Sequence, residues 1–329
     1  MSVIPRPAVP YSATAVRPAW ADLPDELRAA IAGRLGSPVV WATTATAGFT
    51  SGFAGVLDTA AGEKAFVKAA RLVDQRHLCD WYAHEAQVTA ALPAEVAAPR
   101  PRWTLTVAGY FVVCLEAVEA HVPSIPWTPD DLTAALTTWA TAAAALAHPP
   151  ADLVDLGLPT LETLARNDLS WWREIVDGRS PLPPFASPAR DHVTALASLE
   201  SALPPLAAAS APALTHGDLR VDNVLIADDG QTWLCDWNWI CHGPAWFDTA
   251  ALLISAYASG LDADALWSTH PTSKSAPPEA LDASLAALSG YFLTRATAEP
   301  TDASPHLRQH QRWSGEAALS WLLTRQGRS

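Results

Sequence analysis

Residues 214–250 constrain the fold of this chain more than any other stretch, because they predict a β-hairpin with polar side chains at one end. Two apolar segments, residues 223–226 and 232–235, flank a short polar turn that ends in glycine. Such a turn between two apolar runs is typical of a hairpin. Because a hairpin brings its outer ends together, we expect Asn223 and Asp236 to lie side by side.

Asp218 precedes Asn223 on the loop that leads into this hairpin, and the three side chains form a set suited to phosphoryl transfer. Mg²⁺ is typically held by one or two carboxylates, with water and phosphate oxygens completing its shell. Asn223 and Asp236 are therefore the predicted metal ligands. Asp218 is a further carboxylate that the metal does not need, and it can receive the proton of an attacking hydroxyl group.

Three motifs in this stretch resemble the aminoglycoside phosphotransferase family, whose members have a protein-kinase-like fold. They are His216-Gly217-Asp218, then Asp218 spaced five residues before Asn223, and then Asp236-Trp237 followed by Gly243-Pro244 and Asp248. The resemblance implies an α+β fold with two lobes. The small N-terminal lobe (residues 1–117) would hold an antiparallel sheet plus a helix. A hinge (118–123) would join it to a larger, mainly helical lobe (124–329) that carries the catalytic hairpin.

The N-terminal half contains the residues expected to bind ATP. Gly48, Ser51 and Gly52 lie in a turn between two predicted strands, where backbone N–H groups can point at phosphate oxygens. An ordinary hairpin turn is the alternative interpretation of these three residues. Lys68 shares one face of the strand at 63–69 with Phe66, so its amine needs a partner.

The resemblance assigns that partner and the remaining nucleotide contacts. Glu85, on the predicted helix at 73–92, would pair with Lys68 and so position the α- and β-phosphates. A surface salt bridge is the alternative for this pair. The backbone of Glu116 and Val118, at the start of the hinge, would hydrogen-bond the edge of the adenine ring.

Three further polar residues of the catalytic stretch have two interpretations or a supporting role. Arg220 could neutralise charge on the transferring phosphoryl group, or it could pair with Asp222. His216 is expected to hold the loop through hydrogen bonds to the backbone. Asp248 either caps the helix predicted at 247–258 or, as the family pattern implies, also hydrogen-bonds the catalytic loop.

The remaining predicted elements are mostly helices, and two of them bear on an acceptor site. Further helices are expected at 22–35, 128–146, 190–209, 278–293 and 304–325, with a loop or short lid at 262–278. Trp171 and Trp172, in a less regular insertion, could line an acceptor pocket or pack in the core. Glu316 could contact the acceptor or face solvent.

Composition excludes some classes of function. The 329 residues carry a formal net charge of −13, which argues against a nucleic-acid-binding surface. No apolar stretch is long enough to cross a membrane, and no signal peptide is apparent, so we expect a cytoplasmic protein without a membrane partner. The four cysteines include no CxxC pair and are expected to be reduced thiols. The oligomeric state is left open.

The sequence therefore predicts an ATP- and Mg²⁺-dependent phosphotransferase that acts on a hydroxyl group of a small-molecule acceptor. An aminoglycoside-like compound, an amino alcohol or a sugar would suit, and the acidic balance of the chain favours a cationic acceptor. One alternative is a nucleotide-binding pseudokinase with a regulatory role. Another is a metal-dependent phosphoesterase built on His216, Asp218 and Asp236, which would not need Lys68.

Overall fold

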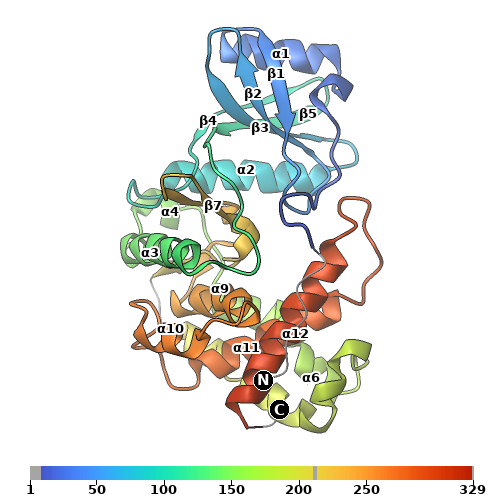
Figure 1. Cartoon of the computed structure of the whole chain (residues 1–329). Coiled ribbons are helices and arrows are strands. Elements are labelled where there is room, and N and C mark those ends of the chain that lie inside the picture. The colour runs from blue at the N-terminus through green and yellow to red at the C-terminus, as the bar shows by residue number, and fades with distance from the viewer. Residues whose placement is uncertain (1–8, 210–212, 328–329) are drawn as a thin grey trace.

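The computed structural model describes residues 9–209 and 213–327, and it has two parts (Figure 1). An antiparallel sheet with two helices forms the N-terminal part, and a larger helical part follows, as the α+β prediction requires. The proline-rich sequence of residues 1–20 predicts an irregular segment, and residues 9–19 contain neither helix nor strand. Residues 1–8 lie outside the described residues.

The N-terminal part is built on a five-stranded antiparallel sheet in the order β1-β2-β3-β5-β4. Its elements are β1 (Val39–Thr44), β2 (Phe53–Thr59), β3 (Lys64–Arg71), β4 (Pro101–Val107), β5 (Tyr110–Glu116), η1 (Trp20–Asp22), α1 (Asp25–Leu35) and α2 (Arg76–Ala91). Side chains alternate along β3: Val67 packs with Ile31 of α1, whereas Phe66 packs toward α2 on the opposite face. Lys68 lies on the face of Phe66, which directs its amine at α2.

Arg100, just before β4, donates hydrogen bonds to backbone carbonyls at the C-terminal end of α2 and in the segment that follows. Its guanidinium donates to four backbone carbonyls, those of Thr89, Leu92, Pro93 and Val96, at 2.7–2.9 Å. The last carbonyls of a helix have no partner within the helix, and Arg100 satisfies that of Thr89 together with three carbonyls of the C-cap and the segment after α2. This contact fixes α2, which carries Glu85, against the sheet.

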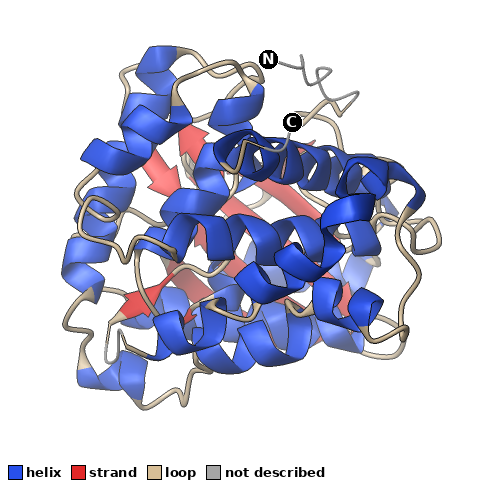
Figure 2. Ribbon diagram, turned by 90° about the horizontal axis from the view of Figure 1, so that it is seen from below, coloured by secondary structure: helices blue, strands red, loops and turns tan. Residues whose placement is uncertain are grey.

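The C-terminal part consists mainly of helices around one large core (Figure 2). Its helices are α3 (Pro129–Leu146), α4 (Ala151–Val154), α5 (Leu161–Asp168), α6 (Trp171–Val176), η2 (Pro184–His192), α7 (Val193–Glu200), α8 (Leu203–Ala208), η3 (Val221–Asn223), η4 (Trp237–Trp239), α9 (Trp246–Ala258), α10 (Ala263–Thr269), α11 (Ala280–Arg295) and α12 (Leu307–Arg325). The tryptophans at 139, 172, 237 and 321 are fully buried. Within the described residues, no helix combines the length and hydropathy that a membrane span needs.

Short strands hold the catalytic stretch within this helical part. The predicted hairpin is present as β7 (Val224–Ile226) paired with β8 (Thr232–Leu234), with Val224 opposite Leu234. A second pair joins β6 (Leu214–Thr215) to β9 (Cys241–His242). Together the two pairs fix both ends of the loop between β6 and β7.

Two element predictions were wrong in detail. The helix expected at 190–209 begins later, because residues 184–192 form the 3-10 helix η2. It is broken into α7 and α8 near Pro204 and Pro205, at which the sequence already predicts a kink or an end. The segment 262–278 is not only a loop, since α10 begins within it after Asp262, whose side chain accepts from the Ala265 N–H.

We predict that Arg100→Met lowers the free energy of unfolding by about 2–3 kcal/mol, because several carbonyls at the end of α2 lose a charged donor. Urea denaturation measures this difference. Arg102→Met is the matched control, since Arg102 is exposed on β4. Equal unfolding free energies for the two variants would contradict the role of Arg100.

Candidate active site

Asp248 of α9 holds the catalytic loop in place. It is completely buried. One carboxylate oxygen accepts from the Gly217 N–H at 3.0 Å and from the Thr215 hydroxyl, and the other accepts from the Leu219 N–H at 3.1 Å. Asp248 therefore fixes residues on both sides of Asp218, as the family pattern implies. It does not cap α9, because the N-cap residue is Ala245 and no described side chain makes a capping hydrogen bond there.

Gly217 is required by the path of this loop. Its φ of 80° lies in the left-handed region, and a Cβ added there would lie 2.1 Å from the carbonyl oxygen of Trp239. The loop thus passes against the backbone that follows Asp236. This close approach brings Asp218 and the metal-binding segment together.

His216 links the loop to the hairpin through the backbone of Cys235. Its Nε2 donates to the Cys235 carbonyl at 2.9 Å, and its Nδ1 accepts from the Asp218 N–H at 3.3 Å. Burial lowers the pKa of His216, so the imidazole is neutral with its proton on Nε2. The ring packs on Trp237 with centroids 4.5 Å apart. His216 thus holds the catalytic loop through hydrogen bonds to the backbone, as the sequence predicts.

Asn223 and Asp236 lie at the same end of the hairpin, with oxygens that no protein donor uses. The Cys235 N–H donates to the Asn223 carbonyl at 2.9 Å, which places Asp236 next to that pair. The Asn223 side-chain nitrogen donates to the Asp218 carbonyl at 2.7 Å, so the amide oxygen is directed away from the loop. Among the described residues, neither that oxygen nor Asp236 Oδ2 accepts a hydrogen bond. A carboxylate and an amide oxygen are a donor set that fits Mg²⁺.

Asp236 has an unusual backbone conformation that a neighbouring side chain supports. Its φ is 61°, uncommon for a residue other than glycine. The Asn238 amide nitrogen donates to Asp236 Oδ1 at 2.6 Å and so orients the carboxylate. The sequence analysis did not identify Asn238 as part of the site.

Asp218 lies within a cluster of charges. Arg220 donates to Asp218 Oδ1 at 2.5 Å and to both oxygens of Asp222 at 3.0 and 3.1 Å. Burial raises the pKa of Asp218 to about 7, although the Arg220 guanidinium acts in the opposite direction. A carboxyl group with that pKa can accept a proton near neutral pH. Arg220 therefore makes the ion pair with Asp222 and also contacts the candidate base.

Lys68 and Glu85 face this cluster from the N-terminal part. The Lys68 amine donates to both carboxylate oxygens of Glu85 at 2.6 and 2.7 Å, and Glu85 is buried. Burial opposes the charge of the amine, but the carboxylates of Glu85 and Asp236 outweigh it and raise the pKa of Lys68. The pair is buried rather than superficial, and it lies near Asp236.

The glycine-containing turn between β1 and β2 is held by side chains from other segments. Gly48 has a φ of 89°, and its carbonyl accepts from the Thr14 hydroxyl at 2.7 Å. Ser51 accepts from Gln75 at 3.3 Å. A Cβ on Gly52 would lie 2.6 Å from the Tyr82 hydroxyl oxygen, so this position has no room for a side chain.

Glu116 and Val118 lie where β5 ends and the connection to the helical part begins. The Glu116 N–H donates to the Arg100 carbonyl at 2.8 Å and is therefore occupied. Within the described chain, the Val118 N–H has no hydrogen-bond partner. Val118 thus has the backbone donor that a nucleobase could use.

A small cavity lies against the catalytic loop on the side of the helical part. Its volume is about 30 Å³. Its lining residues come from the N-terminal segment, the catalytic loop and three helices: Tyr11, Gly217, Asp218, Arg220, Val221, Phe247, Ala251, Ile254, Ser255, Leu288, Phe292, His310, Trp313 and Ser314. Tyr11 and His310 form a hydrogen bond of 2.9 Å in its wall. Asp218 and Arg220 of the catalytic loop thus border this cavity.

Two residues considered for an acceptor site have other contacts. Trp172 is fully buried, and its indole donates to the Ala286 carbonyl at 2.8 Å, so it packs in the core. Glu316 pairs with Arg312 at 2.9 Å on the surface of α12. Neither residue lines the cavity beside Asp218.

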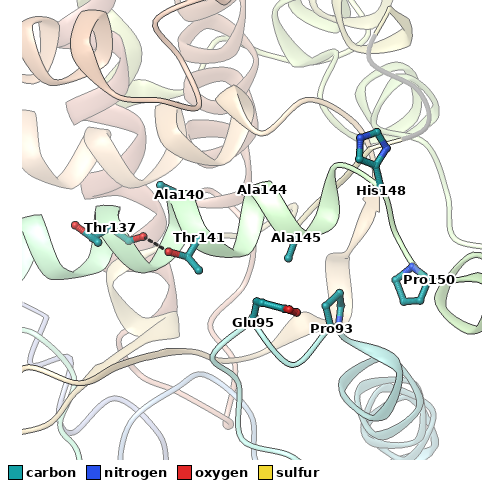
Figure 3. Close-up of a pocket in the computed structure, with 9 residues that line it drawn as sticks. All are labelled: Pro93, Glu95, Thr137, Ala140, Thr141, Ala144, Ala145, His148 and Pro150. Atoms are coloured by element: carbon teal, nitrogen blue, oxygen red, sulfur yellow. Dashed lines mark hydrogen bonds between the residues drawn. The ribbon is translucent and has the colours of Figure 1, made fainter.

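A wider groove lies far from these residues, between the loop after α2 and the exposed face of α3 (Figure 3). Its volume is about 790 Å³, and its walls are mainly alanine, threonine and proline side chains. Glu95 and His148 are its ionisable residues. None of the predicted site residues lines it.

Comparison with known proteins agrees with this arrangement. The sequence model of the phosphotransferase enzyme family matches residues 48–299. A search of curated proteins finds no match to this chain.

Solved structures with the same fold cover nearly the whole chain. A fructosamine-3-kinase homologue from Haemophilus somnus is 14% identical, covers 93% of this chain and 98% of its own, and has a TM-score of 0.54. An aminoglycoside phosphotransferase from Alicyclobacillus acidocaldarius is 17% identical, with 88% and 92% covered and a TM-score of 0.53. A macrolide 2'-phosphotransferase from Brachybacterium faecium is 16% identical, with 87% and 96% covered and a TM-score of 0.54. At this identity the likeness shows the fold.

We predict that Gly217→Ala destabilises the protein more than Gly178→Ala. Gly178 also has a positive φ, 73°, but nothing lies within 4 Å of a Cβ there, so its variant should cost only the left-handed conformation, about 1–2 kcal/mol. Gly217→Ala adds a clash with the Trp239 backbone. Unfolding in urea compares the two variants, and equal losses would show that the loop does not need the close approach.

Proposed function

This chain belongs to the phosphotransferase enzyme family and is a small-molecule kinase, and from that premise we propose that it transfers the γ-phosphoryl group of ATP to a hydroxyl group with the help of Mg²⁺. One observation carries the proposal. Asp248 holds the loop with Asp218 between the oxygens of Asn223 and Asp236 and the cavity lined by helices. A metal-nucleotide and an acceptor could thus approach Asp218 from two sides.

The residues of the chain have distinct roles in this reaction. Asn223 and Asp236 would hold Mg²⁺, which supplies neutralisation of phosphate charge when bound. Lys68, held by Glu85, would position the phosphates, and the Val118 N–H would receive the base. Gly48, Ser51 and Gly52 would cover the phosphates with backbone N–H groups.

Asp218 orients the acceptor hydroxyl and takes its proton. In a loose transition state for phosphoryl transfer the protein contributes mainly position and electrostatics. The raised pKa of Asp218, about 7, suits proton acceptance at neutral pH. Arg220 fixes the carboxylate through its hydrogen bond and brings positive charge next to it.

The cavity beside Asp218 favours an uncharged acceptor over a polycation. Apart from Asp218, no carboxylate lines it, and most of its wall is aliphatic or aromatic. Burial lowers the pKa of His310 to about 4, so this residue is neutral at pH 7. The charged side chains that line this cavity are therefore Asp218 and Arg220, one of each sign, rather than a cluster of carboxylates.

The size of the cavity limits how an acceptor enters. About 30 Å³ holds roughly two water molecules, which is room for the end of an acceptor that carries the hydroxyl group. A larger acceptor would need Tyr11 to withdraw. The rest of the acceptor would then lie outside, against α11 and α12.

The ligands of related structures support the nucleotide and the small acceptor. An aminoglycoside phosphotransferase that is 14% identical to this chain, with a TM-score of 0.51, was solved with ADP and hygromycin B. The same enzyme was also solved with AMP-PNP and hygromycin B. We propose that a nucleotide binds this chain beside Lys68, Asn223 and Asp236, and that its hydroxyl acceptor is uncharged.

We predict that the protein transfers phosphate from γ-labelled ATP and Mg²⁺ to a neutral alcohol or sugar in a panel that also contains aminoglycosides, amino alcohols and macrolides. Asp218→Asn should lower the rate roughly 10²- to 10⁴-fold with ATP affinity retained, because the hydroxyl loses its base. Asp80→Asn is the control, since Asp80 is an exposed carboxylate on α2 paired with Arg76.

The other outcomes identify the alternatives. ATP binding without transfer to any acceptor favours a pseudokinase. Phosphate release that survives Lys68→Ala and needs two metal ions favours a phosphoesterase. Transfer that is confined to aminoglycosides would contradict the neutral acceptor and keep the kinase.

A further inference from the structure

Residues 9–19, which we call the N-terminal strap, run between the sheet of the N-terminal part and α12 (Figure 1). Two contacts join the strap to the helical part: the Tyr11 hydroxyl group forms a hydrogen bond with His310, and the Val16 N–H donates to the Ala303 carbonyl at 3.0 Å. One contact joins it to the N-terminal part, where the Ala15 N–H donates to the Thr46 carbonyl at 2.8 Å. The strap therefore brings its side chains to the glycine-containing turn from outside the kinase motifs.

Arg17 is the cation that the strap places against the glycine-containing turn. Its Nη2 donates to the Ala47 carbonyl at 3.0 Å and to the Thr50 hydroxyl at 3.2 Å. Its Nε is buried and has no hydrogen-bond partner among the described residues. Burial lowers the pKa of Arg17, whereas Tyr82 and, to a smaller extent, Asp236 act in the opposite direction.

Arg17 has no counter-ion among the described residues, because the carboxylates of Glu85, Asp218 and Asp222 pair with other cations. Lys68 pairs with Glu85, and Arg220 pairs with Asp218 and Asp222. Arg17 occurs in none of the ion pairs of the described chain, and its hydrogen bonds go to neutral oxygens. A partly buried guanidinium with an unused N–H forms a stronger hydrogen bond with an anion than with a neutral acceptor. The oxygens of a phosphate group match the planar arrangement of its donors.

We propose that Arg17 binds the β- and γ-phosphates of the nucleotide, as a second cation beside Lys68. The inference rests on the proposed function, since it needs a nucleotide in the cleft. The guanidinium hydrogen-bonds the turn expected to cover the phosphates, at the Ala47 carbonyl and the Thr50 hydroxyl. The strap thus adds a cation to the phosphate site, and Arg17 contacts the end of the nucleotide that carries the γ-phosphoryl group.

Calorimetric titration with Mg-ATP, Mg-ADP, AMP and adenosine tests this assignment. In Arg17→Gln we expect the affinity for ATP and ADP to fall roughly 10- to 100-fold, as for loss of a charged hydrogen bond. Binding of AMP and adenosine should not change. Arg17→Lys should recover part of the affinity because it keeps the charge. Arg76→Gln, on the exposed face of α2, is the matched control.

A second variant separates phosphate binding from support of the turn. Thr50→Val removes the hydroxyl that Arg17 contacts but leaves the guanidinium in the cleft. Nearly wild-type ATP affinity in Thr50→Val, together with the loss in Arg17→Gln, supports direct contact. Equal losses in both variants would overturn it, because Arg17 would then act only by holding the turn.

The failure of the inference differs from the failure of the proposed function. If the wild-type protein binds ATP and Arg17→Gln binds it equally well, Arg17 has no part in phosphate recognition and the kinase assignment is unaffected. If the wild-type protein binds neither ATP nor ADP, the proposed function fails. Thermal unfolding of each variant shows whether it is folded before titration.

Discussion

The buried carboxylate of Asp248 is the constraint on which the rest of the site depends. It accepts three hydrogen bonds from residues 215–219, and a buried charge is stable only when such donors surround it. The donors fix the loop, Gly217 lets the loop approach Trp239, and His216 joins it to Cys235. The position of Asp218 relative to the metal-binding residues therefore follows from the buried carboxylate of Asp248 in the helical part.

The two parts of the molecule supply charges that balance across the cleft. The sheet and α2 bring Lys68 with Glu85, and the loop brings Arg220 with Asp218 and Asp222. Each of these cations already has a carboxylate partner, which keeps the site folded without a ligand but leaves little free positive charge for an anionic nucleotide. Arg17 has no carboxylate partner among the described ion pairs, so the N-terminal strap, outside the catalytic stretch, carries the cation that we propose for the phosphates.

The sequence was sufficient for features that depend on local spacing. Alternation and turn chemistry predict the hairpin, the end of it at which Asn223 and Asp236 come together, and the face of β3 that carries Lys68. The α+β fold was confirmed. Arg17 and Tyr11 could not be found in this way, because residues 9–19 have no periodicity and Tyr11 meets His310 across 299 positions of sequence. The support that Asn238 gives to Asp236 depends on a left-handed backbone that no local pattern indicates.

A crystal structure with Mn²⁺ and AMP-PNP, with the metal located by its anomalous signal, tests the central claim most directly. The account predicts Mn²⁺ bound by the side-chain oxygens of Asn223 and Asp236 and by phosphate oxygens, with Asp218 outside the coordination shell and turned to the acceptor cavity. Metal held by His216 and Asp218, or a nucleotide bound outside the cleft between the sheet and the catalytic loop, would contradict it.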